Sequence, residues 1–438
     1  MADQSARVPS TKRLHIVLIP GFAGFDALGQ LEYYARITPL FQKQRRENEV
    51  LHYFDNFPTA AVATRAARLQ SFLGKRMARG EIARKDDVIL VGHSTGGLDI
   101  RRLVWDLHRR KDPLVVDGGA TVKPADILER IRRVVFLSVP HSGTNIADWV
   151  RAHGLWREAV VAELRAAVGG SQLRILERIE DWIAGAAAGL TGAGLFRALQ
   201  DAVTESSEHC GRPSPLRSAE AHEASSQLGL YLRQMASDFR AIDDLTSEPP
   251  SGGPASPAHF TREREHELKL WRELRIHVLS YATVGSRPFR FDSGRQAPLW
   301  DLAIASTYPE VERDPELSAG TDIVYRTCYR ACAGGPFHWP LHRGTVTRHI
   351  PETATHAIEL WDNDGIVNTA SMPWPEGENV LVVADHMDIV GHYRPVQAAD
   401  GGGRNFQAYD LLKSNSGFGD ERFAAVWEEI LGFCRCRP

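Results

Sequence analysis

The chain has 438 residues, of which 24% are charged and 43% hydrophobic, and its formal net charge is −3. This balance is that of an ordinary globular protein, and the lack of a basic excess argues against a nucleic-acid partner. No run of 18 or more apolar residues predicts a membrane span, and Met1 to Lys12 lacks the apolar core of a signal peptide, so we expect a cytoplasmic protein.

Strand and helix signals alternate over the first third of the chain. The apolar run Leu14–Ile19 ends at Pro20-Gly21, which predicts a buried strand that enters a tight turn. The alternation continues with a helix over Leu31–Gln44, a strand over Glu49–Tyr53, a helix over Ala60–Met77, a strand over Val88–Val91, a helix over Thr95–His108 and a strand over Val134–Ser138. Alternating strands and helices predict an α/β fold with a mostly parallel sheet flanked by helices.

A helical insertion is expected between His141 and Arg272, where the sequence is rich in Ala, Leu, Arg and Glu. Within it, Leu173 to Val203 is apolar but interrupted by glycines, which lower helix stability by up to about 1 kcal/mol each. We interpret the whole insertion, residues 141–272, as a cap over the core, with a flexible loop at 247–257. Residues 1–140 and 273–438 are expected to form the core domain.

The sheet is expected to resume after the insertion. The predicted elements are a strand over Ile276–Tyr281, a loop region to about Thr355, strands over Ala357–Leu360 and Asn379–Ala384, and a closing helix over Asp420–Phe433. Both ends of the chain therefore contribute to one domain.

The stretch Gly92-His93-Ser94-Thr95-Gly96 follows an apolar run and precedes a helical pattern. It has the form G-x-S-x-G, a sharp turn from strand to helix that holds a serine at its tip. Glycine is expected at 92 and 96 because a side chain there would collide with the neighbouring strand or with the following helix. Ser94 is therefore the candidate nucleophile.

A serine nucleophile needs a base to take its proton and a carboxylate to orient that base. Asp364 and His386 each lie just past a predicted strand and follow Ser94 in the order serine, acid, histidine. Asp362 is an alternative acid. The competing bases are His392 and His356.

The oxyanion hole needs two backbone N–H groups directed at the developing negative charge. Thr95, the residue after the nucleophile, is expected to supply one of them at the start of a helix. The other is expected from the loop after the first strand, at Phe22.

The five cysteines form no disulfide framework. The close pairs are Cys328 with Cys332 and Cys434 with Cys436, and their spacings match no common zinc pattern, so we expect free thiols.

These motifs together resemble the bacterial true lipases of the α/β-hydrolase fold. Residues 21–26, GFAGFD, with 31–34, LEYY, are similar to the oxyanion loop and the following segment of the Pseudomonas and Burkholderia lipases, and 139–144, VPHSGT, resembles their P-H-x-G-T stretch. Residues 363–372 and the strand near Tyr281 are closer to the thermoalkalophilic Bacillus and Geobacillus lipases, where the aspartate of N-D-G-I-V is the triad acid.

The resemblance therefore favours Asp364 over Asp362. Residues 385–388, DHMD, are similar to the histidine loop of both groups. The lipases of both groups are secreted, whereas this chain shows no signal segment. We therefore expect their ester chemistry but not their extracellular role.

The sequence departs from these lipases around the oxyanion loop and at their metal sites. Pro20 replaces the histidine that usually precedes the oxyanion glycine, which alters the support of the loop. The zinc ligands of the Bacillus type have no counterpart between Asn56 and Asp87. Asp388 could supply one carboxylate to the calcium site of these lipases, but Tyr393 stands where one group has an aspartate, and calcium needs several oxygen ligands. We expect no metal and no cofactor.

The sequence thus predicts a lipase-like serine carboxylic-ester hydrolase that forms an acyl-enzyme on Ser94. We expect a small-molecule or lipidic ester as substrate and transient contact with a lipid surface through the cap, while the oligomeric state has no signal in the sequence. The alternatives are an acyltransferase that uses the same triad and a non-catalytic binding protein that keeps the fold.

Overall fold

The computed structural model describes residues 12–24, 27–28, 31–152, 230–231, 234, 238–247, 264–288, 321, 323–333, 346–352, 358–359, 361–394 and 410–436. Most of the predicted cap, the glycine-interrupted stretch and residues 248–257 of the predicted loop lie outside these residues, so the cap remains a prediction. Within the described part, no helix is long and apolar enough to cross a membrane.

Seven parallel strands form the central sheet, in the spatial order β10-β11-β9-β8-β5-β1-β4. They span β1 (Leu14–Ile19), β4 (Glu49–Tyr53), β5 (Asp87–His93), β8 (Ile131–Leu137), β9 (His277–Val284), β10 (Val346–Ile350) and β11 (Glu378–Val383). The central strands are buried apolar runs, as expected for a parallel sheet that is covered on both faces. The expected parallel α/β sheet is confirmed.

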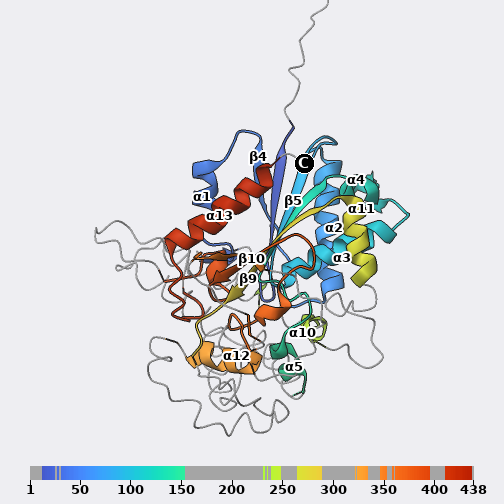
Figure 1. The fold of residues 1–438 in the computed structure, drawn as a ribbon. Coiled ribbons are helices and arrows are strands. Elements are labelled where there is room, and N and C mark those ends of the chain that lie inside the picture. The colour runs from blue at the N-terminus through green and yellow to red at the C-terminus, as the bar shows by residue number, and fades with distance from the viewer. Residues whose placement is uncertain are drawn as a thin grey trace, which may run out of the picture.

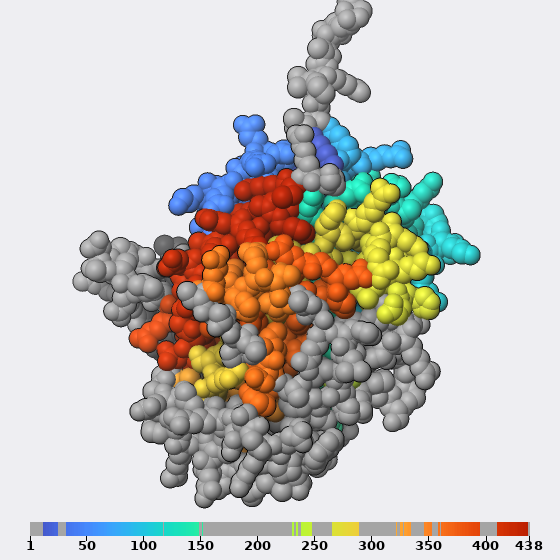
Figure 2. Space-filling model, viewed as in Figure 1, coloured from blue at the N-terminus to red at the C-terminus, as the bar shows by residue number. Residues whose placement is uncertain are grey.

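Helices cover both faces of this sheet (Figure 1). On one side lie α1 (Ile37–Gln44) and α13 (Asp420–Arg435), and on the other α2 (Val62–Ala78), α3 (Thr95–Arg109), α4 (Pro124–Leu128) and α11 (Arg264–Leu274). The space-filling view shows α13 in red and α11 in yellow on opposite sides of the orange segments of the second half (Figure 2). Three further helices, α5 (Asn145–Ala152), α10 (Ala241–Leu245) and α12 (Ile323–Ala333), lie beyond the carboxyl ends of the strands.

Smaller elements connect this framework. They are the antiparallel pairs β2 (Ala27–Leu28) with β3 (Leu31–Glu32) and β6 (Leu114–Val115) with β7 (Thr121–Val122), and the single 3-10 turns η1 (Asp117–Gly119), η4 (Thr369–Ser371) and η5 (Asp388–Val390).

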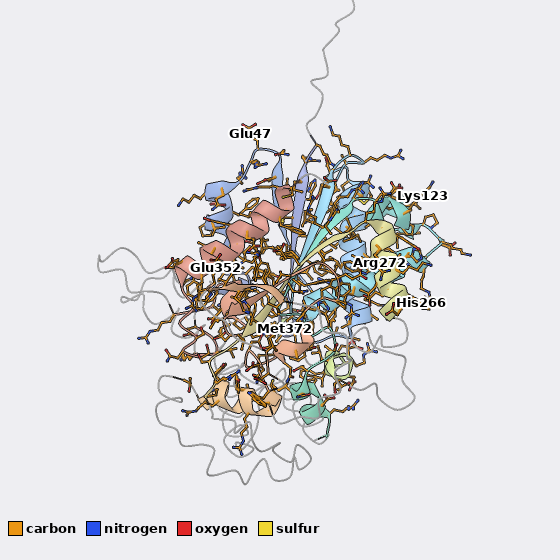
Figure 3. The ribbon with its side chains drawn as sticks, viewed as in Figure 1. Glu47, Lys123, His266, Arg272, Glu352 and Met372 are labelled. Atoms are coloured by element: carbon orange, nitrogen blue, oxygen red, sulfur yellow. The ribbon has the colours of Figure 1, made fainter. Side chains whose placement is uncertain are left out.

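Helix α11 joins the core although it was expected within the insertion. Glu267, on this helix, is buried and forms a bidentate ion pair with the guanidinium of Arg101. Trp271 packs against Phe136 and Trp374 inside the sheet region. On the same helix, His266 lies toward the margin of the molecule in this view, whereas Met372, from another segment, lies near its middle (Figure 3).

Three elements differ from the sequence prediction. The helix expected over Leu31–Gln44 begins only at Ile37, because Arg36 takes a left-handed conformation (φ 62°) that a helix cannot include. The region expected as a loop to Thr355 holds α12 and β10, and β10 is an edge strand whose polar residues hid its signal. Of the strand expected over Ala357–Leu360, the described residues 358 and 359 belong to no strand.

Candidate active site

Ser94 lies at the turn between β5 and α3 in a strained backbone conformation. Its φ of 53° and ψ of −129° are unusual for a residue with a side chain, and such strain concentrates at functional sites. A Cβ at Gly96 would lie 2.3 Å from the carbonyl oxygen of Ile19, and one at Gly92 would lie 2.7 Å from the Gly97 nitrogen. The two glycines therefore let the turn approach β1 and α3, as the sequence predicted.

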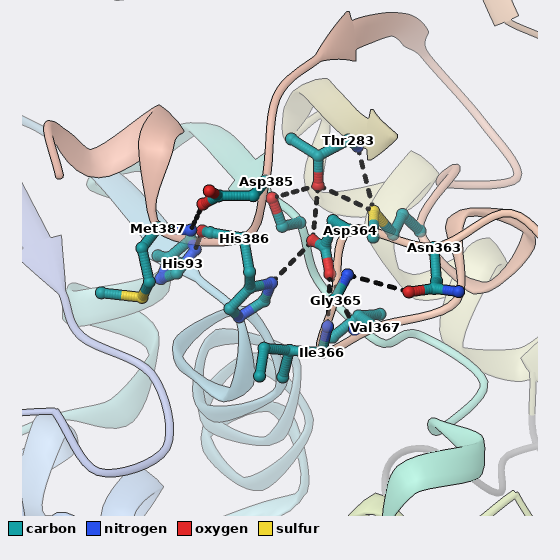
Figure 4. A network of polar contacts seen from close by, with 12 residues as sticks. His93, Thr283, Asn363, Asp364, Gly365, Ile366, Val367, Asp385, His386 and Met387 are labelled. Carbon is teal, nitrogen blue, oxygen red and sulfur yellow. Dashed lines mark hydrogen bonds and ion pairs between the residues drawn. The ribbon is translucent and has the colours of Figure 1, made fainter. Parts of the chain in front are cut away.

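The structure brings Asp364 and His386 together beside the sheet (Figure 4). Oδ2 of Asp364 lies 2.7 Å from Nδ1 of His386, and both side chains are buried. The other carboxylate oxygen, Oδ1, accepts hydrogen bonds from the amides of Ile366 and Val367 at 3.0 and 2.8 Å. Because both oxygens have partners, the carboxylate is held in one orientation and can fix the tautomer of His386.

Thr283, at the end of β9, is a partner of Asp364 that no sequence motif singles out. Its hydroxyl lies 2.6 Å from Oδ2 of Asp364 and 2.8 Å from Oγ of Ser138, which follows β8. Although 81 residues separate Thr283 from Asp364, the amide of Gly285 bonds the carbonyl of Asn363, which brings the acid loop to the end of β9.

The alternative acid and bases have other partners. Both oxygens of Asp362 are engaged by the guanidinium of Arg287, at 2.9 and 3.0 Å. Nε2 of His392 lies 3.0 Å from the carbonyl oxygen of Tyr33. His356 lies outside the described residues.

His386 is carried on a loop that two aspartates shape. The Asp385 carboxylate accepts the amides of Met387 and Asp388, while Oδ2 of Asp388 accepts the amide of Asp385. The hydroxyls of Ser414 and Ser416 complete the set by donating to Asp385 and Asp388 respectively. These reciprocal bonds fix the backbone on both sides of His386.

The same loop contains Asp388, which could supply one carboxylate to a calcium site. Burial raises the pKa of this carboxyl to about 8. Among the described residues, no group of three or more His, Cys, Asp or Glu side chains gathers as a metal site would. The described cysteines, Cys328, Cys332, Cys434 and Cys436, form no disulfide with one another.

In the predicted oxyanion loop, residues 20–24 after β1, one backbone amide has no hydrogen-bond acceptor among the described residues. The amides of Gly21, Ala23 and Gly24 bond the Tyr33 hydroxyl, the Pro58 carbonyl and the Gly21 carbonyl, whereas no described residue accepts a bond from Phe22 N–H. Thr95 is the first residue of α3, so its amide has no partner within the helix. The amides of Phe22 and Thr95 therefore have no partner among the described hydrogen bonds, and their role as oxyanion donors stays a prediction.

The guanidinium of Arg65, on α2, supports the oxyanion loop through hydrogen bonds to its carbonyls. The sequence alone does not predict this role. The guanidinium is fully buried and donates to the carbonyls of Pro20 (2.8 Å) and Gly21 (3.1 Å). Since the Gly21 carbonyl and the Phe22 amide belong to one planar peptide, a bond to the first turns the second toward the opposite side. Asp99, on α3, holds the guanidinium in turn with an Nη2 to Oδ2 distance of 2.9 Å.

The chain returning from the predicted insertion rests on the same loop. The Tyr231 hydroxyl donates to the carbonyl of Ala23 at 2.6 Å, and the ring of Phe239 packs edge-on against that of Phe22. The amide of Ala241, the first residue of α10, bonds the carbonyl of Thr59 at 3.0 Å. These contacts pack the described residues of the predicted insertion against the loop that follows β1.

The loop that carries His386 also packs against His93, the residue before Ser94. The ring of His93 lies 4.6 Å from that of His386, centroid to centroid. The described hydrogen bonds do not include one from Ser94 Oγ to His386. Contacts between a nucleophile and its base commonly tighten only when substrate binds.

Comparison with known proteins yields structural likeness but no relative in sequence. No family model and no curated protein matches the chain. Among solved structures, lipase 1 from Pelosinus fermentans is 15% identical, with coverage of 98% of this chain and all of that one and a TM-score of 0.44. EstA from Clostridium botulinum is 14% identical, with coverage of 93% and 87% and a TM-score of 0.41. The mature lipase BlEst2 from Bacillus licheniformis is 13% identical, with coverage of 88% and 89% and a TM-score of 0.36.

At these identities and TM-scores the likeness assigns no activity to this chain. Its own features are those of an α/β fold: a parallel sheet covered by helices on both faces, with a serine of positive φ at the turn between β5 and α3.

Proposed function

We propose that the protein is a serine carboxylic-ester hydrolase of the lipase and esterase type. The observation that carries the proposal is the buried bond of 2.7 Å between Asp364 and His386, on a loop that packs beside the strained elbow of Ser94. An acid that holds a histidine near a serine at the tip of an elbow supports acyl transfer through that serine.

In the proposed reaction, Nε2 of His386 takes the proton of Ser94 as its oxygen attacks the ester carbonyl. The amides of Phe22 and Thr95 stabilise the negative oxygen that forms, and the loss of one such donor costs about 10²- to 10³-fold in rate. His386 then protonates the departing alcohol, and a water activated by the same histidine releases the acid from Ser94. Asp364 orients His386 and stabilises the imidazolium that forms.

The substrate of this proposal is a small-molecule ester with an apolar acyl group. The rings of Phe22 and Phe239 beside the free amide support an apolar acyl chain near the oxyanion position. The lipid-surface contact expected from the cap depends on residues outside the described part of the chain.

Hydrolysis of p-nitrophenyl esters from acetate to palmitate tests the proposal and measures the acyl preference. We expect turnover that is lost in Ser94→Ala and His386→Ala, with both variants folded as judged by circular dichroism. Adding a short alcohol at rising concentration separates hydrolysis from acyl transfer, because a transferase would form the new ester in preference to the free acid. A folded wild-type protein that cleaves none of these esters would contradict the proposal.

A further inference from the structure

A chain of three buried hydrogen bonds joins the oxyanion loop to the loop of the base. The amide of Gly21 donates to the Tyr33 hydroxyl (2.9 Å), Tyr33 Oη lies 2.6 Å from Nδ1 of His93, and Nε2 of His93 lies 2.9 Å from the carbonyl oxygen of His386. These bonds connect residues that are 12, 60 and 293 positions apart in the sequence. They therefore bridge three segments that meet only in the folded protein.

The direction of each bond is fixed by its two backbone ends. A carbonyl oxygen only accepts, so Nε2 of His93 carries the proton that binds His386. A neutral imidazole then has an acceptor at Nδ1, so the Tyr33 hydroxyl donates to it and receives the Gly21 amide on a lone pair. Burial, with His386 and His392 nearby, holds the pKa of His93 well below its ordinary value, which keeps the ring neutral.

The chain ends on the backbone of Gly21, the residue before the proposed oxyanion donor Phe22, and on the backbone of His386, the proposed base. Tyr33 fixes the amide side of Gly21, and Arg65 holds the carbonyl of the same residue. At the other end, the bond is to the backbone of His386 itself, whose side chain is the proposed base. Tyr33 and His93 are both buried, so water does not compete for these bonds.

We propose that Tyr33 and His93 are positioning residues that set the distance between the oxyanion hole and the catalytic base. Neither touches the reacting atoms, and both act through Gly21 and His386. This inference rests on the proposed ester hydrolysis and assigns a role to His93 beyond its place in the elbow motif.

Two substitutions of His93 break the chain at different bonds. His93→Asn keeps a side-chain acceptor near Nδ1 for Tyr33 but does not reach the carbonyl of His386. His93→Gln reaches toward that carbonyl with an amide donor but does not present an acceptor at the position of Nδ1. Tyr33→Phe removes the hydroxyl and leaves the Gly21 amide without its acceptor.

Tyr34→Phe is the matched control. Tyr34 is also buried, and its hydroxyl lies 2.6 Å from the carbonyl oxygen of Ile19 and 3.4 Å from that of Val91, so the variant loses buried hydroxyl bonds in the same segment. That hydroxyl bonds neither the Gly21 amide nor a histidine ring. The control therefore measures the loss of a buried bond without interruption of the chain.

The test compares kcat, KM and the pH profile of kcat/KM for p-nitrophenyl butyrate, with the urea midpoint of each variant. We expect Tyr33→Phe and both His93 variants to lower kcat by about 10- to 100-fold with KM within about twofold, which is the pattern of an interaction used in the transition state. Tyr34→Phe should shift the urea midpoint by a similar amount with kcat within about twofold of wild type. The double variant Tyr33→Phe/His93→Gln should be no slower than about twofold below the worse single variant, because members of one network are not additive.

Two results would overturn the inference in distinguishable ways. If wild type hydrolyses the ester and the Tyr33 and His93 variants keep its kcat, the positioning role is wrong while the proposed function stands. The same conclusion follows if kcat falls equally in Tyr34→Phe, since the effect is then one of general stability. If the folded wild type hydrolyses no ester, the proposed function is wrong, and the inference that rests on it is wrong as well.

Discussion

Nη2 of Arg65 lies 2.9 Å from Oδ2 of Asp99, and both side chains are fully buried between α2 and α3. This pair ties the helix that follows Ser94 to the carbonyls of Pro20 and Gly21. It supplies the loop support that the replacement of histidine by Pro20 put in question. Burial raises the pKa of Asp99 to about 6, and the adjacent guanidinium opposes that rise.

The losses of stability from removing each partner of this pair are expected to be less than additive. Arg65→Met leaves the Asp99 carboxylate buried and unpaired, which typically costs about 3 to 5 kcal/mol of unfolding free energy. The double variant Arg65→Met/Asp99→Leu should lose clearly less than the sum of the two single variants. Urea unfolding of all four proteins measures this, and additive losses would show that the two side chains are energetically independent.

Asp364→Asn should lower kcat far more than it lowers stability. The amide keeps the shape of the carboxylate but favours the wrong tautomer of the histidine, a change worth about 10⁴-fold in kcat in serine hydrolases of this design. Asp362→Asn is the control, because Asp362 pairs with Arg287 and not with His386. Its kcat should stay within about tenfold of wild type. A greater loss of kcat in Asp362→Asn than in Asp364→Asn would reverse the assignment of the acid.

The crowding at the elbow predicts opposite outcomes for two glycine substitutions. A Cβ at Gly96 would meet backbone of β1 at 2.3 Å, so Gly96→Ala should destabilise the protein or abolish soluble expression. A Cβ at Gly432, on an exposed part of α13, meets nothing within 4 Å, so Gly432→Ala should stabilise the protein by up to about 1 kcal/mol. Thermal unfolding distinguishes the two, and equal stability of both variants would contradict the packing described for the elbow.

A buried cluster away from the active site predicts a loss of stability in acid. Nδ1 of His15 lies 2.9 Å from Nε2 of His52, and Nε2 of His15 lies 3.2 Å from Oδ2 of Asp86. Burial, helped by Arg76, lowers the pKa of His52 to about 3, from the 6.5 of an unfolded chain. Between these values the unfolded state binds a proton that the folded state does not, so stability is full above pH 6.5 and falls as pH drops toward 3.

For one such histidine the slope is at most about 1.4 kcal/mol per pH unit. His52→Gln, which can still bond His15, should flatten the dependence between pH 6.5 and 4 relative to wild type. Urea unfolding at several pH values measures both slopes. Identical slopes would mean that His52 is not buried in its neutral form.

The sequence was sufficient for those parts of the site that depend on local constraints. Gly92 and Gly96 flank Ser94 because a side chain at either position would collide with neighbouring backbone. This steric constraint can be recognised from these five residues alone. His386 follows β11 as expected, whereas the strand expected just before Asp364 is absent at residues 358 and 359. The acid was separated from Asp362 by resemblance. The structure adds the physical difference, which is the engagement of Asp362 by Arg287.

The supporting residues could not be predicted because their partners are distant in the sequence. Arg65 lies on a helix rich in basic residues, where one arginine is expected in solvent, and only folding brings it under Pro20 and Gly21. Thr283 is one β-branched residue among several in a strand. Their roles appear only when sequence separations of 44 and 81 residues close to hydrogen-bonding distance.

Secondary structure was missed where the local pattern was weak or broken. Edge strand β10 contains Arg348 and His349 and buries little, so it lacks an apolar run. In α12, by contrast, Tyr325, Cys328, Tyr329 and Cys332 are buried at helical spacing. That periodicity was present in the sequence and could have identified the helix.

The central claim is that Ser94 is the nucleophile, and covalent labelling with a fluorophosphonate tests it most directly. The wild-type protein should gain one phosphonyl group with loss of fluoride, and peptide mapping by mass spectrometry should locate it on Ser94. Ser94→Ala and His386→Ala should remain unlabelled under the same conditions. A folded wild-type protein that takes up no label, or a Ser94→Ala variant labelled as fast as wild type, would contradict the account.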